Sequence, residues 1–186
     1  MLEIWTIGHS TRSIEEFLEL LQASSIEAIA DVRRHAGSRK YPHFNPEALE
    51  QSLSEAGIEY HAFVDLGGRR KTRPDSQNTV WRNASFRGYA DYMETSEFDE
   101  ALTRLTELAE QKRTTLLCAE AVWWRCHRAL VSDALKARGG EVHHILGPGK
   151  IQAHPYTSAA RVVDGGVSYA GASQSATNSL STDGRS

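Results

Sequence analysis

Reactive side chains are concentrated in the segment Cys118-Ala-Glu-Ala-Val-Trp-Trp-Arg-Cys-His-Arg128, which begins at the end of the apolar run 114–118. The segment contains two thiols, a carboxylate, an imidazole and two guanidinium groups. An apolar run that leads into a helical pattern predicts a strand followed by a helix, so these groups would surround one helix N-terminus. Helix N-termini attract anions because their N–H groups lack partners and carry partial positive charge. The segment is therefore typical of anion binding or catalysis rather than of packing alone.

His9 and Glu120 are candidates for proton transfer, and Asp31 is a further candidate catalytic residue. An unperturbed imidazole titrates near neutral pH, so His9 could act as a general acid or base; the alternative is a turn residue that hydrogen-bonds a carbonyl group. A carboxylate beside cationic groups in a crevice, as expected for Glu120, is seldom placed there for stability alone. Asp31 would orient a catalytic group or supply a second carboxylate, unless it only forms an internal ion pair with Arg33.

Cys118 is a candidate nucleophile, because Arg125, Arg128 and the helix terminus would favour its thiolate. The alternative is an inert buried cysteine, for which a strand end is a common place. The spacing to Arg125 is one residue longer than the Cys-x5-Arg loop of cysteine phosphatases, so that mechanism is not predicted. Cys118 and Cys126 are the two cysteines of the chain. They are too few for a disulfide framework, but their proximity leaves redox pairing open.

Zinc is the metal that these residues would suit, since Cys118, Cys126, His127 and His9 offer four ligands of the right softness. The spacing is not a recognised pair of closely spaced thiolates, and Cys126 and His127 would point in different directions as neighbours on a helix. We therefore predict no metal and no other cofactor, with zinc kept as a less favoured alternative. The chain also lacks a Gly-x-x-x-x-Gly-Lys loop and a Gly-x-Gly-x-x-Gly fingerprint, which disfavours a P-loop ATPase and ordinary dinucleotide binding.

Cations are concentrated in segments 33–45 and 67–87, where Asp75 is the only acid. The basic residues there are Arg33, Arg34, Arg39, Lys40, Arg69, Arg70, Lys71, Arg73, Arg82 and Arg87. Solubility alone normally mixes charges of both signs, so this excess indicates contacts with phosphate. The formal net charge of −3 argues against indiscriminate coating of nucleic acid. The predicted substrate-binding residues are Ser10, Arg12, Arg33, Arg39, Arg69, Trp81, Cys126, His127 and Arg128, with Trp81 stacking on a base.

The elements that must position these residues alternate between strands and helices. The expected strands cover residues 2–8, 26–32, 58–64, 113–118 and 141–146, and the expected helices cover 13–23, 45–57, 85–93, 95–112 and 125–138. Such alternation predicts a single α/β domain with a mainly parallel sheet of about five strands and helices on both faces. The carboxyl ends of parallel strands meet at one edge, where we expect one hollow to be lined by His9, Arg33, Arg69, Glu120 and Arg128.

The domain is expected to cover residues 1–170. Residues 161–169 have the turn chemistry of a small C-terminal hairpin. Residues 171–186 are dominated by Ser, Ala, Gly and Thr, which predicts a disordered tail.

Seven short motifs follow one another along the chain. They are Thr6-Ile-Gly-His-Ser10, Asp31-Val-Arg33, Ser38-Arg39 with Pro42 and Phe44, Gly67-Gly-Arg69, Phe86-Arg-Gly-Tyr-Ala-Asp-Tyr-Met93, Cys118-Ala-Glu120 and Cys126-His-Arg128. In this order they resemble the domain of unknown function 488 family, from about Thr6 to Tyr169. One departure is Ala36, where the family often has proline. The resemblance implies a compact α/β domain and carries no activity with it.

These features together favour an enzyme that binds a nucleotide or part of a nucleic acid and performs hydrolysis or group transfer. One alternative is a non-catalytic nucleic-acid-binding module, and a second is a thiol redox-responsive protein that uses Cys118 and Cys126. No run of apolar residues approaches the roughly 20 needed to span a membrane, and the first residues lack the pattern of a secretory signal. We therefore expect a cytoplasmic protein without a membrane partner, and the oligomeric state is left open.

Overall fold

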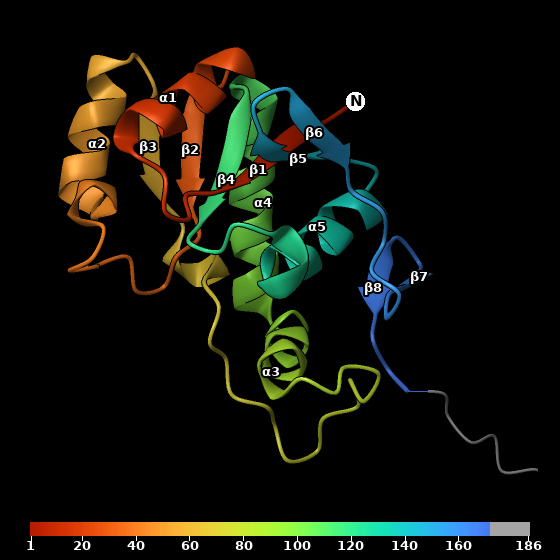
Figure 1. Ribbon diagram of the computed structural model, residues 1–186. Coiled ribbons are helices and arrows are strands. Elements are labelled where there is room, and N and C mark those ends of the chain that lie inside the picture. The colour runs from red at the N-terminus through yellow and green to blue at the C-terminus, as the bar shows by residue number, and fades with distance from the viewer. Residues whose placement is uncertain (172–186) are drawn as a thin grey trace, which may run out of the picture.

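A six-stranded sheet forms the centre of the computed structural model, which describes residues 1–171 (Figure 1). Its strands are β1 (Glu3–Gly8), β2 (Ala28–Asp31), β3 (Glu59–Ala62), β4 (Thr114–Cys118), β5 (Glu141–Gly147) and β6 (Lys150–Ala153). They are ordered β3-β2-β4-β1-β5-β6, and all neighbours are parallel except β5 and β6. The mainly parallel α/β sheet is thus confirmed, and β6 is an antiparallel edge strand that the sequence did not predict.

A separate hairpin of β7 (Arg161–Val163) and β8 (Gly166–Ser168) confirms the predicted C-terminal hairpin. The predicted disorder of residues 171–186 lies, apart from Gly171, outside the described residues. No helix in the described part of the chain is long and apolar enough to cross a membrane.

Five helices connect the strands. They are α1 (Ile14–Ala23), α2 (Pro46–Glu55), α3 (Ala84–Tyr92), α4 (Ser96–Gln111) and α5 (Arg128–Ala137). The predicted cap of α1 is confirmed, because the Ser13 side chain accepts a hydrogen bond from the Glu16 N–H at 3.1 Å. The predicted helix over residues 125–138 begins three residues late. A 3-10 turn at Trp123–Arg125 and an extended Cys126 (φ −135°, ψ 169°) come first, so the reactive segment is mostly a loop.

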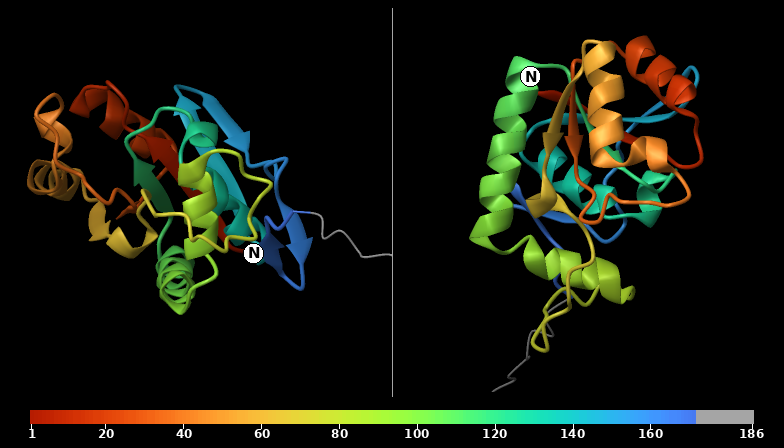
Figure 2. Two further views of the ribbon diagram at one scale, coloured as in Figure 1. Left: turned by 90° about the horizontal axis from the view of Figure 1, so that it is seen from below. Right: turned by 90° about the vertical axis from the view of Figure 1, so that its left-hand side faces the viewer.

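The helices cover both faces of the sheet, as Figure 2 shows. Helices α1 and α2 pack on one face, where Phe17, Leu21, Leu49 and Leu53 are buried against strand residues such as Ile29. Helices α3, α4 and α5 pack on the other face, where the buried residues include Tyr89, Leu102, Leu105 and Leu130 together with Leu116 of β4. Each of these large apolar side chains contributes about 1.5–3 kcal/mol when removed from water. Two apolar layers therefore hold the sheet, one on each face.

The connections that follow the neighbouring parallel strands β1 and β4 lead toward opposite ends of the sheet. These two strands are neighbours, but β1 leads through α1 to β2 while β4 leads through α5 to β5, on the opposite face. In open α/β sheets, ligands bind at the carboxyl edge between two strands of this kind. The topology therefore singles out the place where β1 leads into His9 and β4 ends at Cys118.

Candidate functional site

The loops after β1 and β4 lie directly against each other. The His9 N–H donates to the Cys118 carbonyl at 2.9 Å, and the Ser10 N–H donates to the Ala119 carbonyl at 3.0 Å. Gly8 permits this approach, because a Cβ atom there would lie 1.7 Å from the carbonyl oxygen of Glu120. Side chains from the two strand ends are thereby brought to one small region, which is what the sequence predicted.

Two adjoining hollows occupy this edge instead of the single one expected. The thiol hollow, of about 370 Å³, is lined by Cys118, Cys126 and His127 among others. The imidazole hollow, of about 340 Å³, is lined by His9 and Tyr41 among others. Their volumes fall within the usual range for small-molecule sites, about 300–1,000 Å³. The two hollows share a wall, which consists of Arg33, His35, Ala119 and Glu120.

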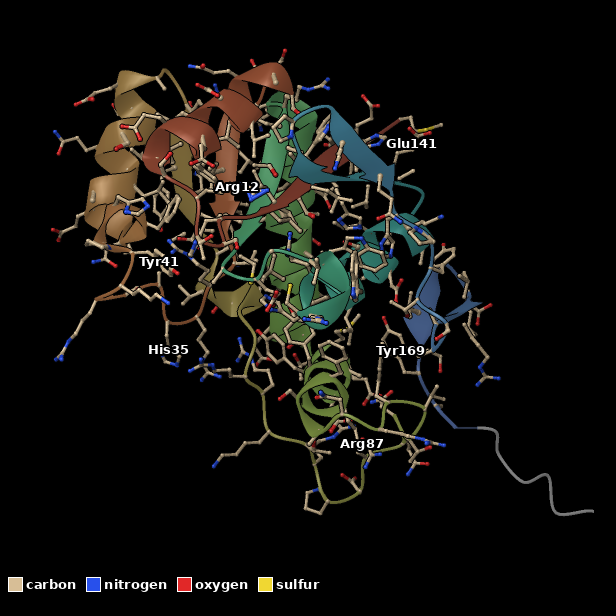
Figure 3. All side chains as sticks on the ribbon, viewed as in Figure 1. Arg12, His35, Tyr41, Arg87, Glu141 and Tyr169 are labelled. Atoms are coloured by element: carbon tan, nitrogen blue, oxygen red, sulfur yellow. The ribbon has the colours of Figure 1, made fainter. Side chains whose placement is uncertain are left out.

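The pleat of the sheet explains why His9 and Cys118 face different hollows. Gly8 of β1 pairs with Cys118 of β4. Residues paired across neighbouring strands point to the same face, and the next residue points to the other. Cys118 accordingly joins the core under α3, α4 and α5, while His9 stacks on Phe44 in the core under α1 and α2. In Figure 3, Tyr41 and His35 lie on the loop after β2, and Tyr169 lies near the C-terminal hairpin.

His9 is a buried imidazole with one free nitrogen. Its ring stacks on Phe44 with centroids 4.3 Å apart, and its Nδ1 lies 2.9 Å from the carbonyl oxygen of Ser10. A carbonyl oxygen can only accept, so Nδ1 carries the proton and Nε2 is left as an acceptor. Nε2 makes no hydrogen bond to any residue that the structure describes. Burial lowers the pKa of His9 below its ordinary value, which favours the neutral imidazole with Nε2 as its acceptor.

Asp31 and Arg33 form a buried, two-pronged ion pair, the alternative that the sequence left open. Arg33 Nε donates to Asp31 Oδ1 at 2.9 Å and Nη2 donates to Oδ2 at 2.8 Å. The Tyr60 hydroxyl donates to Oδ2 at 2.7 Å as well. Asp31 therefore holds Arg33 in place. The remaining Nη1 of Arg33 makes only a long bond of 3.4 Å to the Ala36 carbonyl, and the side chain still lines both hollows.

The two cysteines are buried, free and adjacent. A hydrogen bond from the Cys126 thiol, reinforced by His127 and Arg128, holds the pKa of Cys118 well below its ordinary value against the effect of burial. Burial raises the pKa of Cys126 well above its ordinary value. Of the two sulfurs, Cys118 therefore has the greater thiolate character, and it opens into the thiol hollow.

Arg128 lies beneath the reactive loop and lines neither hollow. Its fully buried guanidinium donates to Cys126 Sγ at 3.0 Å, to Thr6 Oγ1 at 3.4 Å and to the carbonyl oxygen of Glu120. These bonds fix the loop between β4 and α5. Of the five residues expected in one hollow, Arg33, Arg69 and Glu120 share the thiol hollow, His9 faces the adjoining one, and Arg128 supports the loop from below.

The other predicted binding residues are distributed unevenly. Arg69 is exposed and lines the thiol hollow, and Ser10 lines the imidazole hollow. Arg12 donates to the Leu146 carbonyl at 3.0 Å, and the exposed Arg39 lines neither hollow. Trp81, expected to stack on a base, is half-buried.

Packing explains the position of Trp81. Its ring lies 5.0 Å from the ring of Phe86 and 5.6 Å from that of Tyr169. The indole therefore packs against Phe86 and against Tyr169 beside the C-terminal hairpin.

Charge in the thiol hollow is predominantly positive. Its lining includes Arg33, Arg34, Arg69 and Arg125, with Glu120 as the only acid. Glu120 is exposed, and its carboxylate makes no hydrogen bond within the described residues. The carboxylate is therefore available to a ligand from either side of the shared wall.

The ligand atoms of Cys118, Cys126 and His127 all lie within 4.8 Å of one another. The expectation that Cys126 and His127 diverge was wrong, because both precede α5 and Cys126 is extended. His9, the fourth ligand considered, is not part of this group.

Sequence reasoning missed a buried polar network behind the loop. It consists of Thr6, His144, His154, Asp133, Thr157 and Tyr169, joined by hydrogen bonds. One signal was present, since His144 lies two residues after the apolar Val142 in a predicted strand and so shares its inward face. The partners of His144 come from distant segments, and no sequence pattern links them.

Comparison with known proteins gives one family. The family model described as "Domain of unknown function DUF488" matches residues 13–135. The matched region includes the Asp31–Arg33 pair, the cysteines and Arg128, and it leaves out His9 and the C-terminal hairpin. Neither the curated proteins nor the solved structures gave a match.

Proposed function

The chain belongs to the DUF488 family, and we propose that it is an enzyme that binds a nucleotide or a fragment of nucleic acid and performs hydrolysis or group transfer. The phosphate of the ligand binds in the thiol hollow, and the reacting group lies at the shared wall. The two free cysteines fit a reducing compartment, so the proposal places the enzyme in the cytoplasm.

The free Nε2 of His9 is the observation that carries the proposal. The ring is held by Phe44 and by the Ser10 carbonyl, which fixes both its orientation and its tautomer. Nε2 is therefore the nitrogen that can take a proton from water or from a ligand hydroxyl. Glu120, at the shared wall, serves as the second proton-transfer group. A fixed imidazole with an unused acceptor at the switch point of the sheet is poorly explained by stability alone.

Four arginines against one carboxylate support the choice of ligand. Arginine binds phosphate through paired N–H groups, which gives both strength and orientation. Arg33 is pre-oriented by Asp31, whereas Arg69 and Arg125 are exposed and can close on a ligand. The site therefore combines one rigid guanidinium with adjustable ones.

Ligand binding can be tested by thermal shift with inorganic phosphate, nucleoside monophosphates and short single-stranded oligonucleotides, because a ligand of the native state raises the unfolding temperature. Arg69→Ala should weaken binding of the active ligand about tenfold, since charged hydrogen bonds to phosphate contribute about 1.5–3 kcal/mol. Arg82→Ala is the matched control, because Arg82 is an exposed cation of the same loop and lines neither hollow. Equal losses in the two variants would show that binding is diffuse and would contradict the proposed site.

Catalysis can be tested with the ligand found in that screen. His9→Gln should retain binding and lose about 10²–10⁴-fold in turnover, the usual contribution of a general base. His61→Gln is the matched control, because His61 pairs with Glu59 on β3 and lines neither hollow. Unchanged turnover in both His9→Gln and Glu120→Gln would remove the acid–base assignment. Salt-sensitive oligonucleotide binding without any product would instead identify a non-catalytic binding module.

A further inference from the structure

Three metal-ligating side chains meet at the floor of the thiol hollow. Cys118 comes from the end of β4, and Cys126 and His127 come from the residues just before α5. We propose that Cys118, Cys126 and His127 bind a zinc ion whose fourth coordination position faces the thiol hollow. This site is independent of the proposed acid–base role of His9, which belongs to the other hollow.

The spacing of the ligand atoms suits zinc. The two sulfur atoms and a ring nitrogen of His127 all lie within 4.8 Å of one another. Zinc binds sulfur at about 2.3 Å and imidazole nitrogen at about 2.0 Å, which places tetrahedral ligands about 3.5–4 Å apart. Small side-chain adjustments are therefore sufficient to close the site around an ion.

His127 provides a second, independent observation. Its Nε2 is buried and has no hydrogen-bond partner among the residues that the structure describes. Such orphaned polar atoms are uncommon in folded proteins and call for an explanation such as an ion. Gly68 leaves room for the ring, since a Cβ atom there would lie 2.9 Å from His127 Nδ1. The backbone at Gly68 thus leaves space for the imidazole ring in the wall of the thiol hollow.

Arg128 supplies the outer support that thiolate ligands require. Its Nε and its backbone N–H donate to Cys126 Sγ at 3.0 Å and 3.4 Å. Hydrogen bonds of this kind orient metal ligands and stabilise their charge. Two thiolates and one neutral imidazole balance the charge of Zn²⁺. The site then remains attractive to an anion, because Arg128 and the arginines of the thiol hollow are in excess.

Three protein ligands and an open position are typical of a catalytic zinc site, whereas a structural site is closed by a fourth protein ligand. Cys118, Cys126 and His127 all line the thiol hollow, so the open position faces the space proposed for phosphate. A phosphate oxygen or a water molecule is the expected fourth ligand. Metal binding displaces a proton from each thiol that is not already ionised, and these protons pass to solvent.

Cobalt(II) titration of the reduced full-length chain tests the site without any substrate. One equivalent should produce sulfur-to-cobalt charge-transfer absorption together with the d–d bands of tetrahedral cobalt, and zinc should abolish both. Cys118→Ser and Cys126→Ser should each lower the charge-transfer intensity. His127→Gln should weaken cobalt binding by at least about tenfold. Changes to groups that merely support metal ligands already lower metal affinity about 10–100-fold.

His143→Gln is the matched control, because His143 belongs to the second cluster of potential ligands, Glu3, Glu141 and His143, which contains two exposed carboxylates. This variant should bind cobalt like the unmodified chain. Circular dichroism verifies that each variant is folded. Zinc should also protect both thiols of the unmodified chain from alkylation, a readout that needs no variant. Absent charge-transfer bands, bands retained in both cysteine variants, or thiols alkylated equally fast with and without zinc would overturn the proposal.

Discussion

Two pairs of histidines in this molecule are in opposite hydrogen-bonding states. His144 and His154 lie in the interior and use both ring nitrogens. His9 and His127 lie at the carboxyl edge, and within residues 1–171 neither Nε2 has a hydrogen-bond partner. All four imidazoles are largely removed from water, so burial does not distinguish them. The two pairs differ instead in whether both ring nitrogens form hydrogen bonds. Satisfied pairs stabilise the fold, and unsatisfied groups at a sheet edge are the ones available for chemistry.

The interior pair, His144 and His154, belongs to a continuous series of hydrogen bonds between Arg128 and Asp133. Asp133 accepts from His154 Nε2 at 2.8 Å, and in the tautomer where His154 carries only that proton, its Nδ1 accepts from His144 Nε2 at 2.9 Å. His144 Nδ1 then accepts from the Thr6 hydroxyl at 2.6 Å, and Thr6 Oγ1 accepts from Arg128. Every ring nitrogen of the pair takes part in one hydrogen bond. The edge histidines belong to no such chain.

The largest expected change in the free energy of unfolding comes from Asp133, at the end of this series of hydrogen bonds. Asp133→Ala removes the acceptor of His154, Thr157 and Tyr169 and leaves buried donors unsatisfied. The free energy of unfolding should fall by about 3–5 kcal/mol in urea titration, because buried unpaired polar groups each cost about 1–3 kcal/mol. Asp75→Ala, at an exposed carboxylate, should change it by less than about 0.5 kcal/mol. A loss below about 1 kcal/mol for Asp133→Ala would break the comparison between the two pairs.

An intermediate change in the free energy of unfolding is expected when pH is lowered, because of His144. Burial, together with the nearby His154 and Arg128, lowers the pKa of His144 from 6.5 to about 2. The unfolded chain therefore binds a proton below pH 6.5 that the folded chain rejects. Stability from this group is complete above pH 6.5 and is lost as pH falls toward 2, by up to about 1.4 kcal/mol per pH unit. Unfolding measured from pH 7 to pH 4 should show a shallower slope in His144→Gln than in the unmodified chain. Parallel slopes would mean that His144 does not titrate as described.

The smallest expected change in the free energy of unfolding comes from His9, at the carboxyl edge of the sheet. His9→Gln removes an imidazole whose Nε2 has no partner among residues 1–171, so the losses are the stacking on Phe44, the edge contact with Tyr41 and one hydrogen bond. The free energy of unfolding should change by less than about 1 kcal/mol, within the range of ordinary substitutions. A loss as large as that of Asp133→Ala would mean that both histidine pairs serve the fold.

Local chemistry made most of the fold predictable. The capping pattern at Ser13, the alternation of strands and helices and the glycine-rich hairpin turn each act over a few residues, and each was confirmed. Strand β6 was missed because four residues with an exposed, mixed pattern carry little periodicity. The late start of α5 was missed because the helical pattern continues into residues that the 3-10 turn and the extended Cys126 occupy.

The candidate site was predictable in composition and not in arrangement. Strand ends identified His9, Cys118 and Glu120, because carboxyl ends of parallel strands share one edge. Their division between two hollows depends on the pairing of Gly8 with Cys118. That pairing joins residues far apart in the chain, and neither segment specifies it alone. For the same reason the short distances between Cys118, Cys126 and His127 could not be foreseen.

The buried hydrogen-bond network also connects the reactive loop to the C-terminal hairpin. At one end of the network, Arg128 donates hydrogen bonds to Thr6 and to the carbonyl of Glu120. At the other end, Asp133 accepts hydrogen bonds from His154, Thr157 and Tyr169. The family model stops at residue 135, before His154, Thr157 and Tyr169. A fragment cut at that limit would keep both cysteines and Arg128 but would expose Asp133 without partners. We therefore expect the smallest piece able to hold the reactive loop in shape to extend to Tyr169, well past the residues that the family model matches.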